Sequence, residues 1–286
     1  MTAISPLRWP AEALWQAIDP ILPGFTVEVL PQIDSTSSEL MRRARAGLAA
    51  PTLLVAEEQT AGHGRMGRGW RSSGQASLTF SLGLALNPAD WQGLSLAAGL
   101  AVAESLHEGI ALKWPNDLWQ QGRKLGGILI ETTALPGGAD AGGAGRYVVI
   151  GIGLNIAPAQ ALLHAPDTSA PDAPAVSGVP PAWLQSLLPG ITAPEALTRI
   201  ALPLAQAVQA FGRAGFAPFQ PRFAERDALA GQPVRLSNGT QGLAEGVDAT
   251  GALRLRVAGG VQRITSGEIS VRPTHAANTA HAPQGA

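Results

Sequence analysis

The sequence contains no cysteine, and this absence excludes disulfides, thiolate catalysis and cysteine-ligated zinc. An excess of one charge is also lacking, because 20 lysine and arginine residues oppose 21 aspartate and glutamate residues, for a formal net charge of -1. Proteins that hold a nucleic-acid backbone over a broad face usually carry a clear basic excess. Non-specific DNA binding is therefore not expected as the main function.

Targeting signals and long hydrophobic runs are missing as well. The first ten residues lack a basic start followed by an apolar stretch, so no signal peptide is visible. The most apolar segment, Leu94–Leu106, is too short to span a bilayer and contains Glu104. We expect a soluble, cytoplasmic protein that has no membrane partner, with one core of about 200 residues and a smaller second unit.

Lysine is scarce. The basic residues comprise 18 arginines and only two lysines, Lys113 and Lys124. A bias in genome composition accounts for the arginines, but it does not explain why both lysines fall within a dozen positions. Because an ammonium on a flexible stem is not interchangeable with a planar guanidinium, we expect that chemistry selected lysine at both positions.

Hydrophobic periodicity predicts an α+β region over most of the chain. The segment Thr36-Ser37-Ser38-Glu39 is typical of a capping box that begins a helix, and Gly47 is its predicted stop. The expected helices cover residues 11–18, 36–46, 94–107, 182–188, 194–211 (interrupted at Pro203) and 219–229, and the expected strands cover 25–33, 53–56, 77–86, 110–113, 117–120, 124–132 and 147–156.

After Gly231 the pattern changes to short strands with period-two alternation. Val234–Leu236 and Leu253–Val257 flank an Asn238-Gly239 turn, and with segments 261–264 and 268–271 they predict about five strands, enough for a small barrel. The predicted divisions are an N-terminal extension (1–24), a catalytic domain (25–229), a C-terminal domain (230–272) and a disordered tail (273–286). Two insertions rich in alanine with glycine or proline are expected at 134–145 and 157–180.

A loop rich in glycine and arginine, Thr60–Gly74, is the first candidate binding segment. Its five glycines and its arginines Arg65, Arg68 and Arg71 suit close backbone approach to an anion clamped by guanidinium groups. Trp70 suits contact with a planar base. A solvated surface loop is the alternative. The loop is not a P-loop, because the Gly-Lys-Ser/Thr ending is missing.

Two further segments carry candidate chemistry. In Lys113–Asp117, Pro115 restricts Trp114 to an extended conformation and stiffens the turn, so that Asn116 and Asp117 are held in a fixed direction. Asp117 is predicted to bind a hydrated magnesium ion or to orient an incoming amine, with turn capping as the alternative. Lys124 precedes two glycines and is placed to reach an oxyanion, unless it is an ordinary strand-end lysine.

Glycines also interrupt a predicted strand in Gly151-Ile152-Gly153-Leu154-Asn155. Glycine weakens a strand unless something approaches it closely. A bound ligand and simple close packing explain this pattern equally well.

The motifs together resemble those of bacterial biotin protein ligases. Asp34-Ser35-Thr36, Gly62–Trp70, Lys113–Asp117, Lys124–Leu129 and Gly151–Asn155 occur in that family's order and approximate spacing. Residues 267–272 resemble the end of the family's C-terminal barrel, so the resemblance covers roughly residues 25 to 272. It implies a mixed sheet with helices, similar to class II aminoacyl-tRNA synthetases, followed by a small SH3-like β-barrel.

The resemblance also implies a two-step ligation with ATP and Mg²⁺. The biotin carboxylate attacks the α-phosphate to give biotinoyl-5'-AMP and pyrophosphate, and a lysine of the biotin carboxyl carrier protein of acetyl-CoA carboxylase then displaces AMP. Only about 33 residues precede Asp34, without a second helix, so the resemblance is to the monofunctional type and no DNA partner is expected. Whether such a chain is a monomer or a homodimer is left open.

Carried over by motif, the resemblance assigns roles to individual residues. The expected catalytic residues are Arg65, Lys124 and Asp117, and Asp117 is also the expected magnesium ligand. The expected biotin-binding residues are Ser35, Thr36, Ser37, Gln59, His63, Gly64, Arg65, Lys124 and Gly127. The expected nucleotide-binding residues are Arg68, Trp70, Lys113, Asn116, Asn155, Trp183 and Arg272.

Two positions depart from the family pattern. His63 stands where these ligases commonly carry arginine, and Ser37 stands where asparagine is common. Each change alters a hydrogen-bond donor, so loop ordering and biotin affinity are the properties affected. The alternatives are a lipoate ligase or acyltransferase of the same fold, and a non-catalytic biotin sensor, which would release no pyrophosphate.

Overall fold

A computed structural model describes residues 7–70, 72, 74–135, 145–158, 181–265, 269 and 271–274. Most of the two predicted insertions and of the predicted tail lies outside these residues, as do Arg71, Gly267 and Glu268. No helix in the described part of the chain combines the length and the apolar character needed to cross a membrane.

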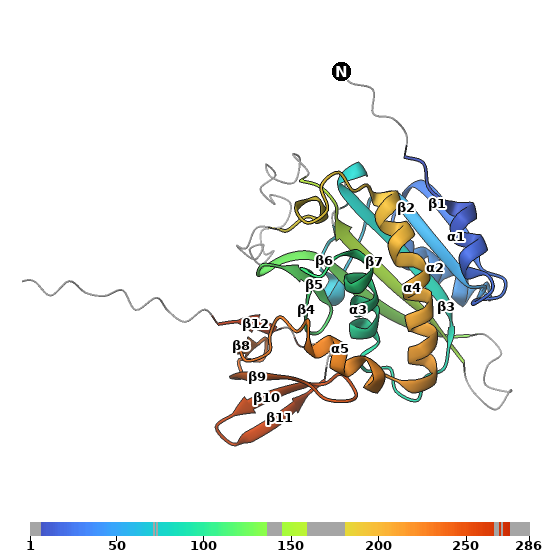
Figure 1. Ribbon diagram of the computed structural model, residues 1–286. Coiled ribbons are helices and arrows are strands. Elements are labelled where there is room, and N and C mark those ends of the chain that lie inside the picture. The colour runs from blue at the N-terminus through green and yellow to red at the C-terminus, as the bar shows by residue number, and fades with distance from the viewer. Residues whose placement is uncertain are drawn as a thin grey trace, which may run out of the picture.

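A seven-stranded mixed sheet forms the centre of the fold (Figure 1). Its strand order is β1-β2-β3-β7-β6-β5-β4, in which β1 and β2 run parallel and every other neighbouring pair is antiparallel. The strands are β1 (Thr26–Ile33), β2 (Thr52–Gln59), β3 (Ser77–Leu86), β4 (Ala111–Lys113), β5 (Asp117–Gln120), β6 (Arg123–Ala134) and β7 (Arg146–Asn155).

One face of the sheet is covered by three helices, α1 (Ala11–Ile18), α3 (Leu94–Leu106) and α4 (Ala193–Ala214), of which α3 and α4 lie side by side in Figure 1. Side chains alternate across a strand, so Leu78, Phe80 and Leu82 of β3 all point into this core. The apolar residues Leu14 and Ile18 of α1 belong to the same core. The predicted N-terminal extension is therefore packed into the main body.

The opposite face is only partly covered, by α2 (Thr36–Arg45). A small cluster packs beneath this helix, and the rest of the face carries polar residues and glycines. The cluster comprises Leu40, Met41, Ala44, Leu54, Tyr147 and Val149.

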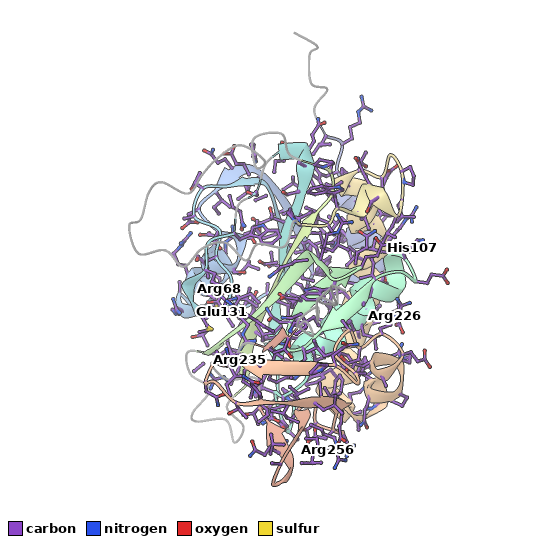
Figure 2. The ribbon with its side chains drawn as sticks, turned by 90° about the vertical axis from the view of Figure 1, so that its left-hand side faces the viewer. Arg68, His107, Glu131, Arg226, Arg235 and Arg256 are labelled. Atoms are coloured by element: carbon purple, nitrogen blue, oxygen red, sulfur yellow. The ribbon has the colours of Figure 1, made fainter. Side chains whose placement is uncertain are left out.

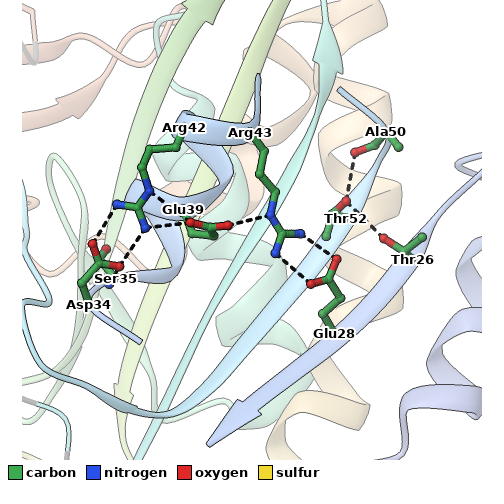
Figure 3. Close-up of polar contacts among 9 residues, drawn as sticks. All are labelled: Thr26, Glu28, Asp34, Ser35, Glu39, Arg42, Arg43, Ala50 and Thr52. Carbon is green, nitrogen blue, oxygen red and sulfur yellow. Dashed lines mark hydrogen bonds and ion pairs between the residues drawn. The ribbon is translucent and has the colours of Figure 1, made fainter. Parts of the chain in front are cut away.

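An ion-pair network fixes the outer side of α2 (Figure 3). Arg42 donates to both carboxylate oxygens of Asp34, Arg43 donates to both oxygens of Glu28, and Glu39 accepts from both arginines. The hydrogen bond from Arg42 lowers the pKa of Asp34. Most of these side chains are at least a quarter exposed, so the network orients the helix more than it stabilises the fold.

The predicted capping box at the start of this helix is wrong by one residue. Ser35 is the N-cap, and its Oγ accepts a hydrogen bond of 3.3 Å from the Ser38 backbone N–H. With Ser35 as the N-cap, the third helical position is Ser38, so Glu39 is not at the capping-box position, and its carboxylate binds Arg42 and Arg43. Thr36 and Ser37 are therefore the first helical residues, and their hydroxyls point towards the sheet, where both bond Ser81.

Three predicted helices differ from the structure. The predicted interruption at Pro203 is wrong, because α4 continues through it and holds a buried face that includes Ile200 and Leu204. The predicted helix over 182–188 is a single 3-10 turn, Leu184–Ser186. The predicted helix over 219–229 is reduced to a 3-10 turn (Ala217–Phe219) and α5 (Gln220–Ala224), because residues 226 and 228 pair with Leu112 of β4 instead.

The C-terminal strands form a five-stranded antiparallel sheet in the order β11-β10-β9-β8-β12. The predicted barrel is not closed in the described residues, and of the predicted last strand, 268–271, only residues 269 and 271 are described. The sequence analysis did not name β9, whose alternation is interrupted by Gly242 and Gly246. The strands are β8 (Pro233–Leu236), β9 (Gln241–Val247), β10 (Leu253–Val257), β11 (Gly260–Ile264) and β12 (Val271–Pro273).

This second sheet packs directly on the first. Val234, Leu253 and Leu255 belong to the main hydrophobic core, and the indole N–H of Trp114 donates 3.0 Å to the Gly251 carbonyl. The turn that follows Trp114 is thus held by both sheets.

Candidate active site

The candidate site begins with a strip of sheet that lacks side chains. Strand register places Asp117, Gly127 and Gly153 in one row across β5, β6 and β7, and Gly151 lies next to Ser81 in a neighbouring row. We call Gly127, Gly151 and Gly153 the glycine floor. The floor lies on the face that α2 leaves partly open.

Side chains of this protein approach the glycine floor closely. A Cβ atom on Gly153 would lie 2.5 Å from two ring carbons of Trp70, and one on Gly151 would collide with Ser37 Oγ. Such distances are too short for any real contact, so both positions need glycine. Close packing by Trp70 and Ser37 thus accounts for the glycines of β7 in this structure.

One wall of the floor consists of hydroxyl and amide groups. Thr36 Oγ1 and Ser37 Oγ lie 2.7 Å and 3.0 Å from Ser81 Oγ, and Gln59 Oε1 accepts from the Thr36 backbone N–H at 2.7 Å. We call Thr36, Ser37, Gln59 and Ser81 the hydroxyl wall. Thr36, Ser37 and Ser81 are buried, with exposed fractions of 3%, 6% and 0%. Because no member is charged, the wall suits a neutral polar ligand.

The glycine- and arginine-rich loop folds back over the floor as a small hairpin. His63 and Gly69 form a β-bridge, the Gly64 N–H donates 2.7 Å to the Arg68 carbonyl, and the Trp70 N–H donates 2.8 Å to the Gly62 carbonyl. The predicted loop is therefore ordered over residues 60–70. Its tip is exposed at Met66, Arg68 and Gly69.

Arg65 connects the loop to two distant parts of the chain. Its guanidinium donates 3.3 Å to Asn116 Oδ1 and 3.4 Å to the backbone carbonyl of Ile269. Burial lowers the pKa of Arg65, with a smaller opposing effect from the Asp117 carboxylate. Asn116 is itself fixed, since its Nδ2 donates 2.8 Å to the Ile128 carbonyl.

The two lysines of the protein meet at Asp117. Lys124 Nζ lies 2.7 Å from Asp117 Oδ1, and Lys113 Nζ lies 3.8 Å from Asp117 Oδ2. The Lys113 ammonium also sits 5.1 Å from the centre of the Trp119 ring, a cation–π distance. Burial lowers the pKa of Lys113, and Asp117 partly offsets this effect. We call Lys113, Lys124 and Arg65 the cationic wall.

Asp117 does not have the surroundings of a metal ligand here. Each of its carboxylate oxygens faces a lysine ammonium, and a divalent cation would be repelled by both. No group of three histidine, cysteine, aspartate or glutamate side chains in the described ranges is arranged to hold a metal ion. These contacts favour an ion-pair role for Asp117 over the magnesium role predicted for it.

Two of the predicted nucleotide residues, Trp70 and Asn155, lie beside Gly153 of the floor. Asn155 follows Gly153 on β7, and its Nδ2 donates 3.1 Å to the carbonyl of Ala182, the residue before Trp183. Trp70 lies on Gly153 nearby. Burial has the largest effect on the lowered pKa of Lys113, and repulsion from Lys124, Arg68 and Arg272 of β12 lowers it further.

Comparison with known proteins agrees with this geometry. The model of the biotin/lipoate A/B protein ligase family matches residues 29–155, and that of the biotin protein ligase C-terminal domain matches residues 230–272. The biotin--[acetyl-CoA-carboxylase] ligase of Paracoccus denitrificans is 33% identical over 260 residues, which cover 84% of this chain and 98% of the relative. The enzyme of the same name from Mycobacterium tuberculosis is 32% identical to this chain, and the matched region covers 88% of that enzyme.

The chain belongs to the biotin protein ligase family. Its fold matches the solved biotin protein ligase from Aquifex aeolicus in complex with biotin and ATP. The TM-score is 0.67 at 25% identity, over 87% of this chain and 99% of that one. The family and the mixed α+β fold expected from the sequence motifs are thereby confirmed.

Within this ligase fold, sequence analysis missed two side chains that contact predicted site residues. Ser81 is a polar residue on the open face of an otherwise apolar strand, and its alternation with Phe80 and Leu82 was the available signal. Glu131 lies on β6 beyond the glycines, and its Oε2 is 3.6 Å from His63 Nε2. No local pattern marks Glu131, because its partner is 68 residues away in the sequence.

Proposed function

We propose that this protein activates biotin with MgATP and transfers it to a lysine of the biotin carboxyl carrier protein of acetyl-CoA carboxylase. In the first step a biotin carboxylate oxygen attacks the α-phosphorus and pyrophosphate leaves. In the second step the carrier amine attacks the acyl carbon, the amide forms, and AMP leaves with the electron pair of the acyl–oxygen bond.

The observation that carries the proposal is the pairing of a neutral wall with a cationic wall across the glycine floor. The hydroxyl wall offers hydrogen-bond donors and acceptors to an uncharged ureido group. Lys113, Lys124 and Arg65 offer positive charge to a carboxylate and a phosphate. Two anions repel each other, and fixed cations between them lower the barrier to their reaction.

Lys124 is the residue assigned to the biotin carboxylate and the acyl phosphate. Its side chain is about half exposed and lies over Gly127, so its ammonium can leave Asp117 for an arriving anion without burying an unpaired charge. Asp117 keeps both lysines on the same side of the floor. In the second step we assign its carboxylate to orientation of the carrier amine.

Magnesium enters this proposal as part of the MgATP substrate. The contacts of Asp117 give no resident metal site, so the phosphates themselves are assigned as the ligands of the ion. Arg68, Arg272 and Lys113 are assigned to the phosphates, and Trp70, Asn155 and Trp183 to the end of the floor where the adenine is expected.

The loop of residues 60–70 is assigned to closure over the acyl-adenylate, with His63, Gly64 and Arg65 above the floor. A mixed anhydride is hydrolysed readily, so water must be kept out until the carrier arrives. We assign residues 25–229 to activation and 230–272 to a C-terminal domain that abuts the site through the Arg65–Ile269 contact.

The test is pyrophosphate exchange into ATP by the purified protein, with biotin, with lipoate and without either acid. Exchange that depends on biotin supports the proposal. Exchange that depends on lipoate favours the alternative ligase, and biotin binding without exchange favours a sensor. Mass spectrometry of an added carrier domain measures the second step.

A further inference from the structure

Glu131 has a carboxylate that the proposed reaction does not use. It lies on β6, two residues from Leu129 and four from Gly127, so alternation places its side chain on the face of the glycine floor. Its Oε2 is buried and accepts no hydrogen bond from the described residues. A buried carboxylate oxygen without a partner is costly unless a positive charge is brought to it.

The loop holds a side chain near Glu131 that can carry a positive charge, His63. His63 Nε2 lies 3.6 Å from Glu131 Oε2, and both side chains are 31% exposed. The backbone bridge between His63 and Gly69 fixes the position of the imidazole relative to the hairpin. Arg65, two residues further on, reaches Asn116 and Ile269 instead. His63 and Arg65 therefore contact the body of the protein at separate places.

These two contacts differ in chemistry. Arg65 keeps its charge at every relevant pH, whereas histidine changes charge near neutrality. The loop segment Thr60–Gly74 contains no acidic residue, so Glu131 is the carboxylate that faces His63 from the sheet. The same loop segment also carries the cations Arg65 and Arg68. Figure 2 shows Arg68 and Glu131 on the same side of the molecule.

We propose that Glu131 is a positioning residue that holds the loop of residues 60–70 closed through protonated His63, so that the acyl-adenylate is retained more tightly below neutral pH than above it. When His63 is neutral, 3.6 Å is too long for a hydrogen bond, so the loop loses this contact while those of Arg65 and Trp70 remain. The retention of the acyl-adenylate rests on the proposed function, whereas the contact between His63 and Glu131 does not.

The first experiment measures the release of biotinoyl-AMP from preformed complex at about pH 6 and about pH 8. The variants are Glu131→Gln, which removes the charge and keeps the shape, and His63→Arg, which carries a charge at both pH values. We expect release from the unaltered protein to be about threefold to fivefold slower at the lower pH, the range of a partly exposed ion pair. Glu131→Gln should release fast at both pH values and His63→Arg slowly at both. His107→Gln is the control for histidine titration elsewhere.

The second experiment needs no substrate. Trypsin cleavage after the exposed Arg68 reports how often the loop opens, and comparison of variants at the same pH cancels the pH dependence of the protease. Cleavage should be faster in Glu131→Gln than in the unaltered protein at the lower pH, and equal at the higher pH.

The outcomes separate this inference from the proposed function. If biotinoyl-AMP never forms, the proposed function fails, and the cleavage experiment alone decides the contact. The inference is overturned if Glu131→Gln keeps the pH dependence of the unaltered protein, or if His63→Arg opens as readily as Glu131→Gln.

Discussion

The hydroxyl wall and the cationic wall face the same glycine floor but are built in opposite ways. Thr36 and Ser37 sit in the first turn of a helix and Ser81 sits in a central strand, and all three are buried. Arg65 and Lys124 stand on a hairpin loop and at a strand end, and the Lys124 side chain is 47% exposed. Neutral buried groups on rigid elements suit recognition, whereas cations that range from the buried Lys113 to the half-exposed Lys124 suit a site where charge forms.

The electrostatics of the two walls also differ. The members of the hydroxyl wall are neutral and bond one another. The cationic wall places two ammonium groups on one carboxylate, so positive charge is left over. An incoming anion neutralises this excess positive charge. Four variants, ordered here by expected effect, test this contrast.

The largest effect is expected for Lys124→Ala, which removes the cation assigned to the reacting carboxylate. Loss of one such group costs on the order of 100-fold in rate, so pyrophosphate exchange should fall by about that factor. Biotin affinity should change much less, since the hydroxyl wall is intact. An unchanged exchange rate would refute the role of Lys124. Arg123→Ala, the neighbouring strand residue, is the control.

A smaller effect is expected for Arg65→Ala. The substitution removes the loop contacts to Asn116 and Ile269, so biotinoyl-AMP should leak on the order of tenfold faster while it still forms. The measurement is release of the intermediate from a single-turnover reaction. Tight retention would contradict the assignment of this loop to closure. Arg146→Ala, whose guanidinium bonds Thr132, is the matched control.

The hydroxyl wall is tested by Gly151→Ala. The new methyl group would collide with Ser37 Oγ, and forcing extra volume into a packed site costs about 1–3 kcal/mol. Weaker biotin binding and a lower melting temperature are expected in calorimetry. The double variant with Ser37→Ala should recover stability because the colliding atom is removed. Gly145→Ala, where a Cβ meets nothing within 4 Å, should have no effect.

The smallest effect at neutral pH is expected for Lys113→Arg. Burial lowers the pKa of Lys113, so its proton is lost at a lower pH than that of an ordinary lysine, and adenylation should decline on the alkaline side. Arginine stays charged throughout, so the decline should move to higher pH in the variant. The pH profile of pyrophosphate exchange measures this. An identical alkaline limb in both proteins would show that Lys113 does not set it.

Most of the elements could be predicted from local patterns. The strand that contains Phe80 and the helix that begins beside Ser35 have clear periodicity, so their existence was predicted correctly and only the cap was misplaced by one residue. The helix through Pro203 was misjudged because burial of Ile200 and Leu204 outweighs one lost backbone hydrogen bond, and burial is not a local property. The strand at Gln241–Val247 was missed because its glycines interrupt the alternation.

The sequence by itself determined the family and the mixed fold, because short motifs and local periodicity carry both. It did not mark Ser81 or Glu131, which lie beside the floor. Only the tertiary structure decided which groups meet across the sheet. Ser37 on Gly151 and His63 beside Glu131 are contacts between segments far apart in the chain. These contacts are created by strand register and by the packing of α2, and local periodicity predicts neither of the two.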